Sequence, residues 1–506
     1  MTMDQELALE IMHAGHSVFL TGPAGSGKTY VLNKFISQAK AEGKYVSVTA
    51  TTGLAATHLG GNTIHSWSGI GIHNKLTADF YKLLTKSRID TINKTDVLII
   101  DEISMLHDYR LDMIDEITRH VREVDKPFGG LQIILCGDFF QLPPINRANE
   151  PMGSFVVKSN VWQELDPVIC YLQVQHRQQD DEFLEILNAI RAGDIRRNHA
   201  EKLLARQSID LDAFGEVTEL YITNADVDSI NMSRLQSINS DEYTYVMSTN
   251  GKDNYVKTLK RSCLASEMLA LKKGALVMFI KNNQEKHYVN GSLGTVIDFE
   301  EITDFPIVQL KNGRKVVASP ESWELRDGDT KRASLTQIPL RLAWAITVHK
   351  SQGMTLDAAR IDLRRAFVEG MGYVALSRVR NIDNLSLVGI NKMALKVSED
   401  ALEIDQTLRK KSQQDGVLLA GLRKNSKKRK QLKPKINGTW TEKITKMRKT
   451  YPNAYKPWTE NDDKKLVRLF SGKKPPTVKE LTTKFGRHPG SIRARLKKHF
   501  GEDAVV

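Results

Sequence analysis

Short apolar runs alternate with helical patterns over the first third of the chain. The runs are Ser17–Leu20, Tyr45–Ala50, Val97–Ile100 and Leu131–Cys136. A helical pattern over Tyr30–Ala39 follows the first of them. The third run is apolar at every position, which is typical of a parallel sheet covered by helices on both faces. We therefore predict an α/β domain over residues 1–168.

A second α/β pattern occupies residues 169–405, with helical segments at Asp180–Ala192 and Val227–Gln236. Short strands with turn residues interrupt it from about 262 to 332, and Asn312-Gly313 is a hairpin signal. The expected strands are Leu276–Ile280, Leu293–Ile297, Ile307–Leu310 and Val316–Ala318. We expect a small β-barrel inserted into the second domain, with the α/β pattern resuming at Leu335.

The last hundred residues differ in composition. Residues 406–437 are predicted to be a basic linker, and residues 438–506 a compact domain of three helices. A capping box at Thr477–Glu480 starts the second helix, and Pro489 suits the first turn of the third. The residues expected to form its core are Leu466, Leu469, Phe470, Leu481, Phe485, Ile492 and Leu496.

Charge follows this division. The net charge is +13, yet residues 1–405 carry −7 and residues 406–506 carry +20. A basic appendage on a mildly acidic body predicts a polyanion partner, most simply nucleic acid, and a solubilising tail is the alternative. The three cysteines lie far apart, which fits a reducing cytosol and gives no zinc site. No apolar run approaches the roughly 20 residues of a membrane span.

The segment GPAGSGKT at Gly22–Thr29 fits the phosphate-binding pattern G-x-x-x-x-G-K-[ST]. Its glycines, Gly22, Gly25 and Gly27, allow the backbone to turn its N–H groups toward phosphate oxygens. Lys28 is expected to reach the β- and γ-phosphates, and the Thr29 hydroxyl to bind Mg²⁺. The preceding strand and following helix are the context that this motif requires.

Further polar residues follow buried strands. Asp101 ends an apolar strand and would hold the same Mg²⁺, with Glu102 as the base for the attacking water. Alone they could be a solvated pair, but beside the phosphate loop they predict ATP hydrolysis. Gln141 could sense the γ-phosphate. Arg177 and Arg378 could stabilise its developing charge, although each arginine alone is more readily a surface ion-pair partner.

Nine segments occur in the order seen in superfamily-one DNA helicases. They are GPAGSGKT, VTATTGLAA (Val48–Ala56), NTIHS (Asn62–Ser66), IIDEISM (Ile99–Met105), GDFFQLPP (Gly137–Pro144), HRQ (His176–Gln178), VNGSLGTV (Val289–Val296), TVHKSQG (Thr347–Gly353) and VALSRV (Val374–Val379). As a set they resemble the Pif-one (petite integration frequency) family, a relative of the RecD-like helicases. The resemblance implies two RecA-like P-loop domains, an accessory loop at about 57–75 and an SH3-like inserted barrel.

The resemblance also implies roles for single residues. Gln5 would read adenine, Gln352 and Gly353 would lie at the nucleotide edge, and Arg177 and Arg378 would act on the γ-phosphate. The implied DNA contacts are Thr51, Thr52, His65, Asn224, Thr347 and His349. Without the surrounding motifs, the two histidines would be read as hydrogen-bonded core residues.

The implied function is an ATP- and Mg²⁺-dependent 5′→3′ DNA helicase that moves on single-stranded DNA. It would unwind duplex or structured DNA in replication, repair, recombination or telomere maintenance. Its partners would be single strands and junctions with duplex, with no membrane. The chain would act as a cytoplasmic monomer, associated with the nucleoid if the source is bacterial. An ATPase that remodels protein–DNA complexes without unwinding is the main alternative. The Gln5, Gln141, Arg177 and Arg378 set argues against a third candidate, a metabolic P-loop kinase.

The third helix of the C-terminal domain, Pro489–His499, carries a basic face. It resembles the recognition helix of small helix-turn-helix or Myb-like modules, with Ile492 and Leu496 facing inward. The DNA contacts predicted there are Arg493, Arg495 and Lys497. Basic residues on the solvent face of a helix are the alternative.

Overall fold

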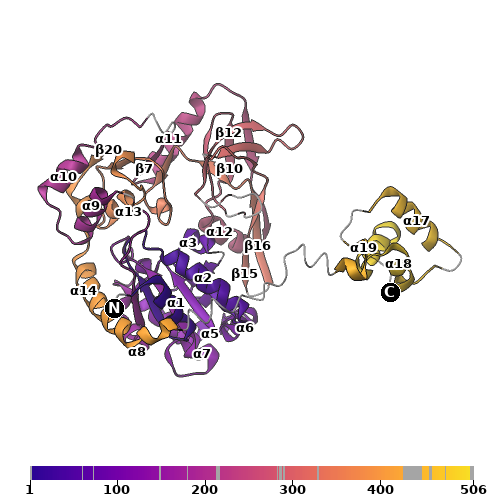
Figure 1. The fold of residues 1–506 in the computed structure, drawn as a ribbon, viewed down its shortest axis with the longest axis horizontal. Coiled ribbons are helices and arrows are strands. Elements are labelled where there is room, and N and C mark those ends of the chain that lie inside the picture. The colour runs from indigo at the N-terminus through magenta and orange to yellow at the C-terminus, as the bar shows by residue number, and fades with distance from the viewer. Residues whose placement is uncertain are drawn as a thin grey trace. The chain divides into compact units, whose positions relative to one another are not determined.

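The computed structural model describes residues 3–59, 61–71, 73–146, 150–178, 180–211, 217–281, 283, 288, 291–310, 312–327, 330–424, 447–454, 458–472 and 475–501. Contacts between residues divide the chain into two compact units, Met1–Ser426 and Lys427–Val506. Each unit is described by itself below (Figure 1).

A six-stranded parallel sheet forms the first α/β domain, in the order β3-β2-β4-β5-β1-β6. The strands are β1 (Val18–Thr21), β2 (Val46–Ala50), β3 (Asn62–Thr63), β4 (Val97–Asp101), β5 (Gln132–Gly137) and β6 (Val168–Tyr171). The four strands predicted from apolar runs are confirmed as β1, β2, β4 and β5. The stretch predicted as an accessory loop contains β3 and the short helix α4 (Ile64–Ser68).

Alternating side chains of this sheet pack on opposite faces. Val97 and Ile99 join a core with α1 (Gln5–His13) and α2 (Lys28–Ala41), whereas Leu98 and Ile100 face the core that includes α7 (Asp108–Arg122). The remaining helices of this domain are α3 (Gly53–His58), α5 (Ala78–Lys82), α6 (Lys86–Lys94) and α8 (Asn160–Leu165). The parallel, doubly covered sheet therefore confirms the predicted α/β class.

The second α/β domain contains a four-stranded parallel sheet in the order β18-β7-β19-β20. Its strands are β7 (Thr218–Tyr221), β18 (Ala345–Thr347), β19 (Ala359–Leu363) and β20 (Leu385–Ile390). The helices beside it are α9 (Asp181–Arg191), α10 (Arg197–Leu204), α11 (Asn224–Ser237) and α13 (Met371–Leu376). Both segments predicted to be helical here are helices in the structure, α9 and α11.

Antiparallel strands interrupt this domain over a longer stretch than 262–332. A five-stranded sheet comprises β11 (Leu276–Phe279), β12 (Leu293–Phe299), β13 (Pro306–Leu310), β14 (Lys315–Val317) and β17 (Leu340–Leu342). Further pairings join β8 (Glu242–Val246) to β10 (Met268–Lys272), and β9 (Ser248–Gly251) to β16 (Thr330–Gln337) and β15 (Glu321–Asp327), with α12 (Asp253–Ser262) beside them. The earlier strands escape prediction because β9 is fully exposed and β8 is half exposed, so neither has an apolar run.

The boundaries predicted at 168–169 and at 405–406 each fall inside an element of the structure, the first within β6 and the second within α14 (Glu399–Leu418). Helix α14 continues through the first part of the predicted linker. Its Asp415 and Ser412 side chains accept hydrogen bonds from the backbone N–H groups of Ile169 and Tyr171, at 2.8 and 3.1 Å. These N–H groups belong to the edge strand β6 and need partners, which the polar sequence of α14 supplies. Positions 425–437 of the predicted linker lie outside the described residues.

The C-terminal unit contains α17 (Glu460–Phe470), α18 (Val478–Phe485) and α19 (Pro489–Phe500). Capping boxes start the first two helices, at Thr459 and Thr477. The buried residues shared by the three helices are Leu466, Leu481, Phe485, Ile492 and Leu496, with Leu469 and Phe470 packed against them. The segment at 438–446 lies outside the described residues.

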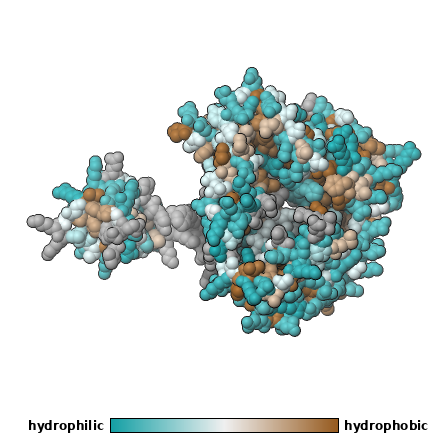
Figure 2. Space-filling model, turned by 180° about the vertical axis from the view of Figure 1, so that it is seen from behind, coloured by the Kyte–Doolittle hydropathy of each residue, from teal (hydrophilic) through white to brown (hydrophobic). Residues whose placement is uncertain are grey.

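The surface is predominantly hydrophilic on the face drawn in Figure 2, where hydrophobic residues form small groups. Among the described helices, none combines the length and apolar character that crossing a membrane demands.

Candidate nucleotide and DNA site

The phosphate loop joins β1 to α2 through three glycines with positive φ. These angles are 141° at Gly22, 83° at Gly25 and 85° at Gly27. A Cβ at Gly27 would lie 2.2 Å from Nε2 of Gln5, and one at Gly22 would lie 2.2 Å from a backbone oxygen. Gln5 donates a hydrogen bond to the Ser26 carbonyl at 3.0 Å. The loop conformation thus requires glycine, and it brings Gln5 against the loop.

Lys28 begins α2, so its charge lies at the positive end of the helix dipole. Its Nζ donates to the carbonyl oxygens of Gly22 and Pro23, at 2.8 and 3.1 Å. Among the described residues, Lys28 forms no ion pair with a carboxylate. This arrangement leaves the lysine charge available for a phosphate.

Asp101 and Glu102 lie at the carboxyl end of β4. Asp101 accepts a hydrogen bond from the Glu102 N–H at 2.9 Å, and Glu102 has a left-handed backbone with φ of 52°. Burial raises the pKa of the Asp101 carboxyl. Burial, followed by the charge of Asp101, raises the pKa of Glu102 to about 7. A carboxylate with that pKa is suited to accept a proton near neutral pH.

The second domain supplies two arginines to the same region. Arg378 is only 1% exposed, and its guanidinium donates to the carbonyls of Val374, Ser351 and Met354 and to the Ser377 hydroxyl. Arg177 donates to the Ser377 carbonyl at 3.0 Å. Burial, followed by the charge of Arg177, lowers the pKa of Arg378 to about 9. All of these acceptors are neutral, and within the described residues neither arginine forms an ion pair with a carboxylate.

Gln352 connects the two domains at this point. Its Nε2 donates to the Glu102 carboxylate at 2.8 Å and to the Gln141 side-chain oxygen at 3.2 Å. The predicted base and the predicted γ-phosphate sensor are therefore linked through one amide. Gly353 follows directly, with φ of 79°.

One cavity of about 410 Å³ collects most of the predicted nucleotide residues. It is lined by Ala24, Gly25, Gly27, Lys28, Thr29, Glu102, Gln141, His176, Arg177, Gly353, Thr355, Arg378 and Arg380. Gln5, Gly22, Asp101 and Gln352 are not in that lining and adjoin it through the contacts above. Sequence reasoning did not assign a role to Ala24, His176, Thr355 or Arg380. Ala24 and His176 stand within the quoted segments GPAGSGKT and HRQ, and Thr355 and Arg380 each lie two residues from a predicted position.

A smaller cavity of about 290 Å³ includes the predicted DNA residues of the first domain, Thr51, Thr52 and His65. His107, Arg110 and Glu150 also line it and were not predicted. Burial, followed by the nearby charge of Arg110, lowers the pKa of His65 to about 4, so this ring is neutral at neutral pH. His65 is therefore uncharged in this wall, and the charge of Arg110 is paired with Glu150, whose carboxylate lies 3.5 Å away.

Thr51 lies between the two cavities. Its hydroxyl donates to the backbone carbonyl of Glu102 at 2.9 Å, and its N–H donates to the Asp101 carbonyl at 3.2 Å. A residue of the predicted DNA surface is thus hydrogen-bonded to the backbone of the two residues that carry the predicted catalytic carboxylates.

The DNA residues predicted in the second domain form a separate group. Lys350 donates to the Asn224 side chain at 2.8 Å, and its N–H donates to the Thr347 hydroxyl at 3.3 Å. His349 precedes it, and burial lowers the pKa of this imidazole. Lys350 was missed, although it stands within the quoted motif TVHKSQG.

The predicted contacts on α19 differ from one another. Arg493 and Lys497 are exposed. Arg495 instead binds both carboxylate oxygens of Asp463 on α17, with one N–O distance of 2.6 Å, and lies over the Trp458 ring. Its guanidinium therefore joins helices within the unit.

Comparisons with known proteins identify the family of the chain. The model of the PIF1-like helicase family matches residues 2–201, and that of the DNA helicase Pif1 2B domain matches residues 254–299, among the antiparallel strands. The ATP-dependent DNA helicase Pif1 of Psychrobacter sp. is 41% identical over 455 residues, covering 78% of this chain and 69% of that protein. Human PIF1 is 36% identical over 413 residues, covering 80% of this chain and 64% of its own length.

The chain thus spans about two thirds of the length of these two relatives. A solved structure of Bacteroides Pif1 helicase, in complex with ADP-AlF3 and single-stranded DNA, shares 32% identity and a TM-score of 0.61. The match covers 81% of this chain and 98% of that one. The chain belongs to the Pif1-like family of ATP-dependent DNA helicases.

Proposed function

We propose that this ATP-dependent DNA helicase moves 5′→3′ along single-stranded DNA and separates duplex or structured DNA ahead of it. One observation carries the proposal: a single cavity between the two domains is lined by Lys28, Thr29 and Glu102 from one side and by Arg177 and Arg378 from the other. Closing such a cleft on ATP moves the two domains relative to each other. The direction of movement is taken from the family resemblance.

The roles of the residues follow from their chemistry. The loop N–H groups and Lys28 bind the phosphates, and Gln5 reads the adenine edge. Glu102 accepts the proton of the attacking water, while Gln352 holds its carboxylate in place and is itself bonded to Gln141. Arg177 and Arg378 stabilise the negative charge that develops on the γ-phosphate.

Thr29 and Asp101 would hold Mg²⁺. A hydroxyl and a carboxylate are the oxygen donors that this cation prefers, with phosphate oxygens and water completing its shell. The raised pKa of the buried Asp101 carboxyl supports the fit, because a bound cation would offset the cost of burying that charge. When bound, Mg²⁺ supplies neutralisation of the phosphate charge.

The DNA residues couple to this chemistry through Thr51. Because Thr51 binds the Glu102 backbone, a strand lying on Thr51, Thr52 and His65 acts on the position of the catalytic base. Thr51, Thr52 and His65 form the first grip on the strand, and Asn224, Thr347 and His349 form the second. Alternate tightening of the two grips during opening and closing moves the strand in one direction.

Unwinding of two duplexes that differ only in a 5′ or a 3′ single-stranded tail tests the proposal, with Lys28→Ala as the control. We expect ATP-dependent separation of the 5′-tailed duplex alone, lost in the variant. Separation of the 3′-tailed duplex would overturn the direction. ATP consumption stimulated by single strands without separation of either duplex would favour the second candidate, a remodelling ATPase, which the basic C-terminal region supports.

We further propose that the chain works as a monomer and that exposed cations of α19 hold duplex DNA near a junction. In a bacterial cell, these contacts would associate the protein with the nucleoid. Light scattering of the protein on a forked duplex gives the number of chains per fork. Two chains on every active fork would contradict the monomer.

A further inference from the structure

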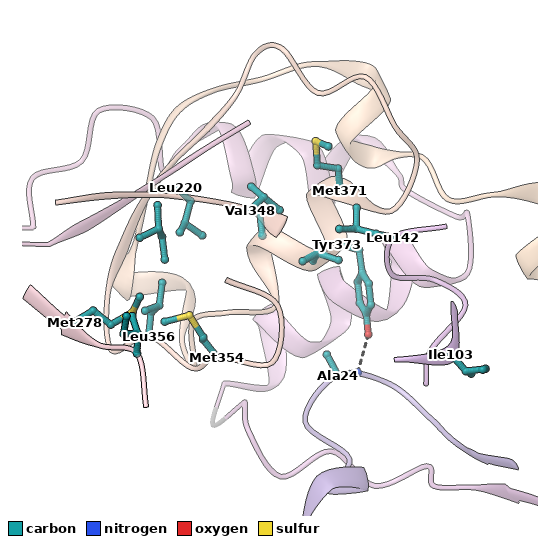
Figure 3. Packing of buried hydrophobic residues seen from close by; sticks show 14 of the residues in the cluster. Ala24, Ile103, Leu142, Leu220, Met278, Val348, Met354, Leu356, Met371 and Tyr373 are labelled. Atoms are coloured by element: carbon teal, nitrogen blue, oxygen red, sulfur yellow. Dashed lines mark hydrogen bonds between the residues drawn. The ribbon is translucent and has the colours of Figure 1, made fainter. Parts of the chain in front are cut away.

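The side chain of Tyr373 crosses from the second domain to the phosphate loop of the first. Its hydroxyl accepts a hydrogen bond from the Ala24 backbone N–H at 3.0 Å (Figure 3). Tyr373 is 1% exposed and Ala24 is 4% exposed. A buried N–H needs a partner, so this bond determines how closely the two elements approach.

Tyr373 belongs to the helix that leads to Arg378. Helix α13 packs on β19 and α9 of the second domain, and Arg378 lies two residues beyond its end. The N-cap of this helix, Gly370, fits closely against the first domain, where a Cβ would lie 2.6 Å from the Phe140 carbonyl oxygen. The contact between Tyr373 and Ala24 is therefore a direct link between the phosphate loop and the segment that carries a γ-phosphate arginine.

Arg191 fixes the Tyr373 hydroxyl from the other side. Its Nη1 lies 2.7 and 2.8 Å from the carboxylate oxygens of Asp138 and 3.5 Å from the Tyr373 hydroxyl. Its guanidinium also lies 4.1 Å from the centre of the Phe140 ring. Since Asp138 stands three residues before Gln141, the same group joins Tyr373 to the predicted γ-phosphate sensor.

We infer that Tyr373 is a positioning residue for hydrolysis, whose hydroxyl locks the phosphate loop onto the arginine-bearing helix when the cleft is closed. The inference rests on the proposed function. In an open cleft, water would satisfy the Ala24 N–H, so loss of the hydroxyl penalises the closed state alone. Binding of nucleotide to the first domain does not need this bond.

The test is Tyr373→Phe in the full chain, which keeps the ring and removes only the hydroxyl. The matched control is Tyr81→Phe, because the Tyr81 hydroxyl bonds Glu116 within the first domain, away from the cleft. Three quantities are measured: the affinity for Mg-ADP, the affinity for Mg-ADP with aluminium fluoride as a closed-state probe, and kcat against KM for ATP.

For Tyr373→Phe we expect kcat and the affinity for Mg-ADP with aluminium fluoride to fall by about 5- to 100-fold, because the buried Ala24 N–H is left without a partner. The Mg-ADP affinity should stay within about twofold, and the control should match the wild type in all three quantities. Thermal unfolding identifies a variant that merely folds poorly, because its unfolding midpoint would then lie below that of the wild type.

Two results overturn the inference: a kcat and an aluminium fluoride affinity within about twofold of wild type, or an equal loss of ADP affinity. The failure of the proposed function looks different. In that case the wild-type chain itself shows no ATP turnover with single-stranded DNA, whatever residue stands at 373.

Discussion

The cations of the nucleotide cleft and those of the C-terminal unit are held in opposite ways. Lys28, Arg177 and Arg378 bind neutral carbonyl and hydroxyl oxygens, and within the described residues none of them pairs with a carboxylate. In the C-terminal unit, Arg495 binds Asp463 and Arg487 binds Asp462. A buried charge without a counter-ion costs stability. The cleft bears this cost and keeps charges that a bound phosphate can pair with. The ion pairs of the C-terminal unit instead join its helices.

Arg191 shows that position alone does not decide the role. It lies beside the cleft, yet Asp138 and Asp405 pair with it, as in the C-terminal unit. The charge balance around an arginine, rather than its distance from the site, therefore separates the arginines that we propose to act on phosphate from those that stabilise the fold.

The largest expected effect is on turnover. Arg177→Ala should lower kcat by about 10³-fold or more, because an arginine acting on the γ-phosphate contributes that much to phosphoryl transfer. Affinity for Mg-ADP should stay near that of the wild type. Arg197→Ala is the matched control, since Arg197 forms an exposed pair with Glu201. An equal loss of nucleotide affinity and turnover would remove Arg177 from the catalytic set.

Arg191→Met should instead act on folding. Removing one partner of a buried pair leaves Asp138 uncompensated, which costs about 3–5 kcal/mol of the free energy of unfolding. Urea unfolding measures the loss. The double variant Arg191→Met with Asp138→Leu should recover much of it, because the lone charge is gone. A variant of unchanged stability would break the comparison between paired and unpaired arginines.

The pH dependence of ATP hydrolysis tests the raised pKa of Glu102. A general base works in its ionised form, and this fraction rises as the pH increases through about 7. Below that pH, kcat/KM should fall by about tenfold per unit. His65 does not contribute, since its pKa of about 4 keeps it neutral over this range. An unperturbed glutamate, with a pKa of about 4.3, would give a flat profile between pH 6 and 8.

Much of the cleft could be predicted because its chemistry is written in contiguous segments. Glycine spacing identifies residues 22–29, and an apolar run identifies the strand that ends at Asp101. Arg191 and Tyr373 carry no such signal, because each gains its role from partners far away in the chain, 53 and 349 residues distant for Asp138 and Ala24.

The same reason explains the misplaced boundaries. Helix α14 has polar residues such as Ser412 and Asp415 facing the first domain, so its sequence predicts a solvent-exposed segment. In the structure these side chains instead accept hydrogen bonds from the edge strand β6. Strands β8 and β9 pair with distant β10 and β16, and their exposed patterns give no hydrophobic period. Long-range pairing, rather than local preference, determines these elements.

A truncation can now be made at the right place. Ending the chain at residue 424 retains α14, whereas ending it at 405 would remove the bonds of Ser412 and Asp415 to β6. We expect the chain that ends at residue 424 to keep its DNA-stimulated ATPase. It should bind forked duplex about tenfold more weakly than the full chain at low salt, with a shallower salt dependence. Unchanged fork affinity at low salt would reduce the basic region to a solubilising tail.

The smallest and most selective effects should separate two arginines on α19. Arg493 is exposed, so Arg493→Ala should lower fork affinity by about threefold and reduce the salt slope by about one, as for one lost phosphate contact. Hydrogen exchange of α17 and α19 should not change. Fluorescence anisotropy with labelled forks at several salt concentrations measures the binding.

Arg495→Ala should show the reverse, with faster exchange in both helices and little change in the salt slope. The hydrogen bond from Arg495 lowers the pKa of Asp463 to about 2. A depressed carboxyl pKa contributes stability above the unfolded value of about 3.9, and that contribution is lost as the pH falls toward 2. Acid should therefore loosen α17 and α19 in the parent chain and much less in the variant. If instead Arg495→Ala lost the salt slope and kept its exchange rates, a carboxylate-paired arginine would be the DNA contact, and charge balance would no longer distinguish the two kinds of arginine.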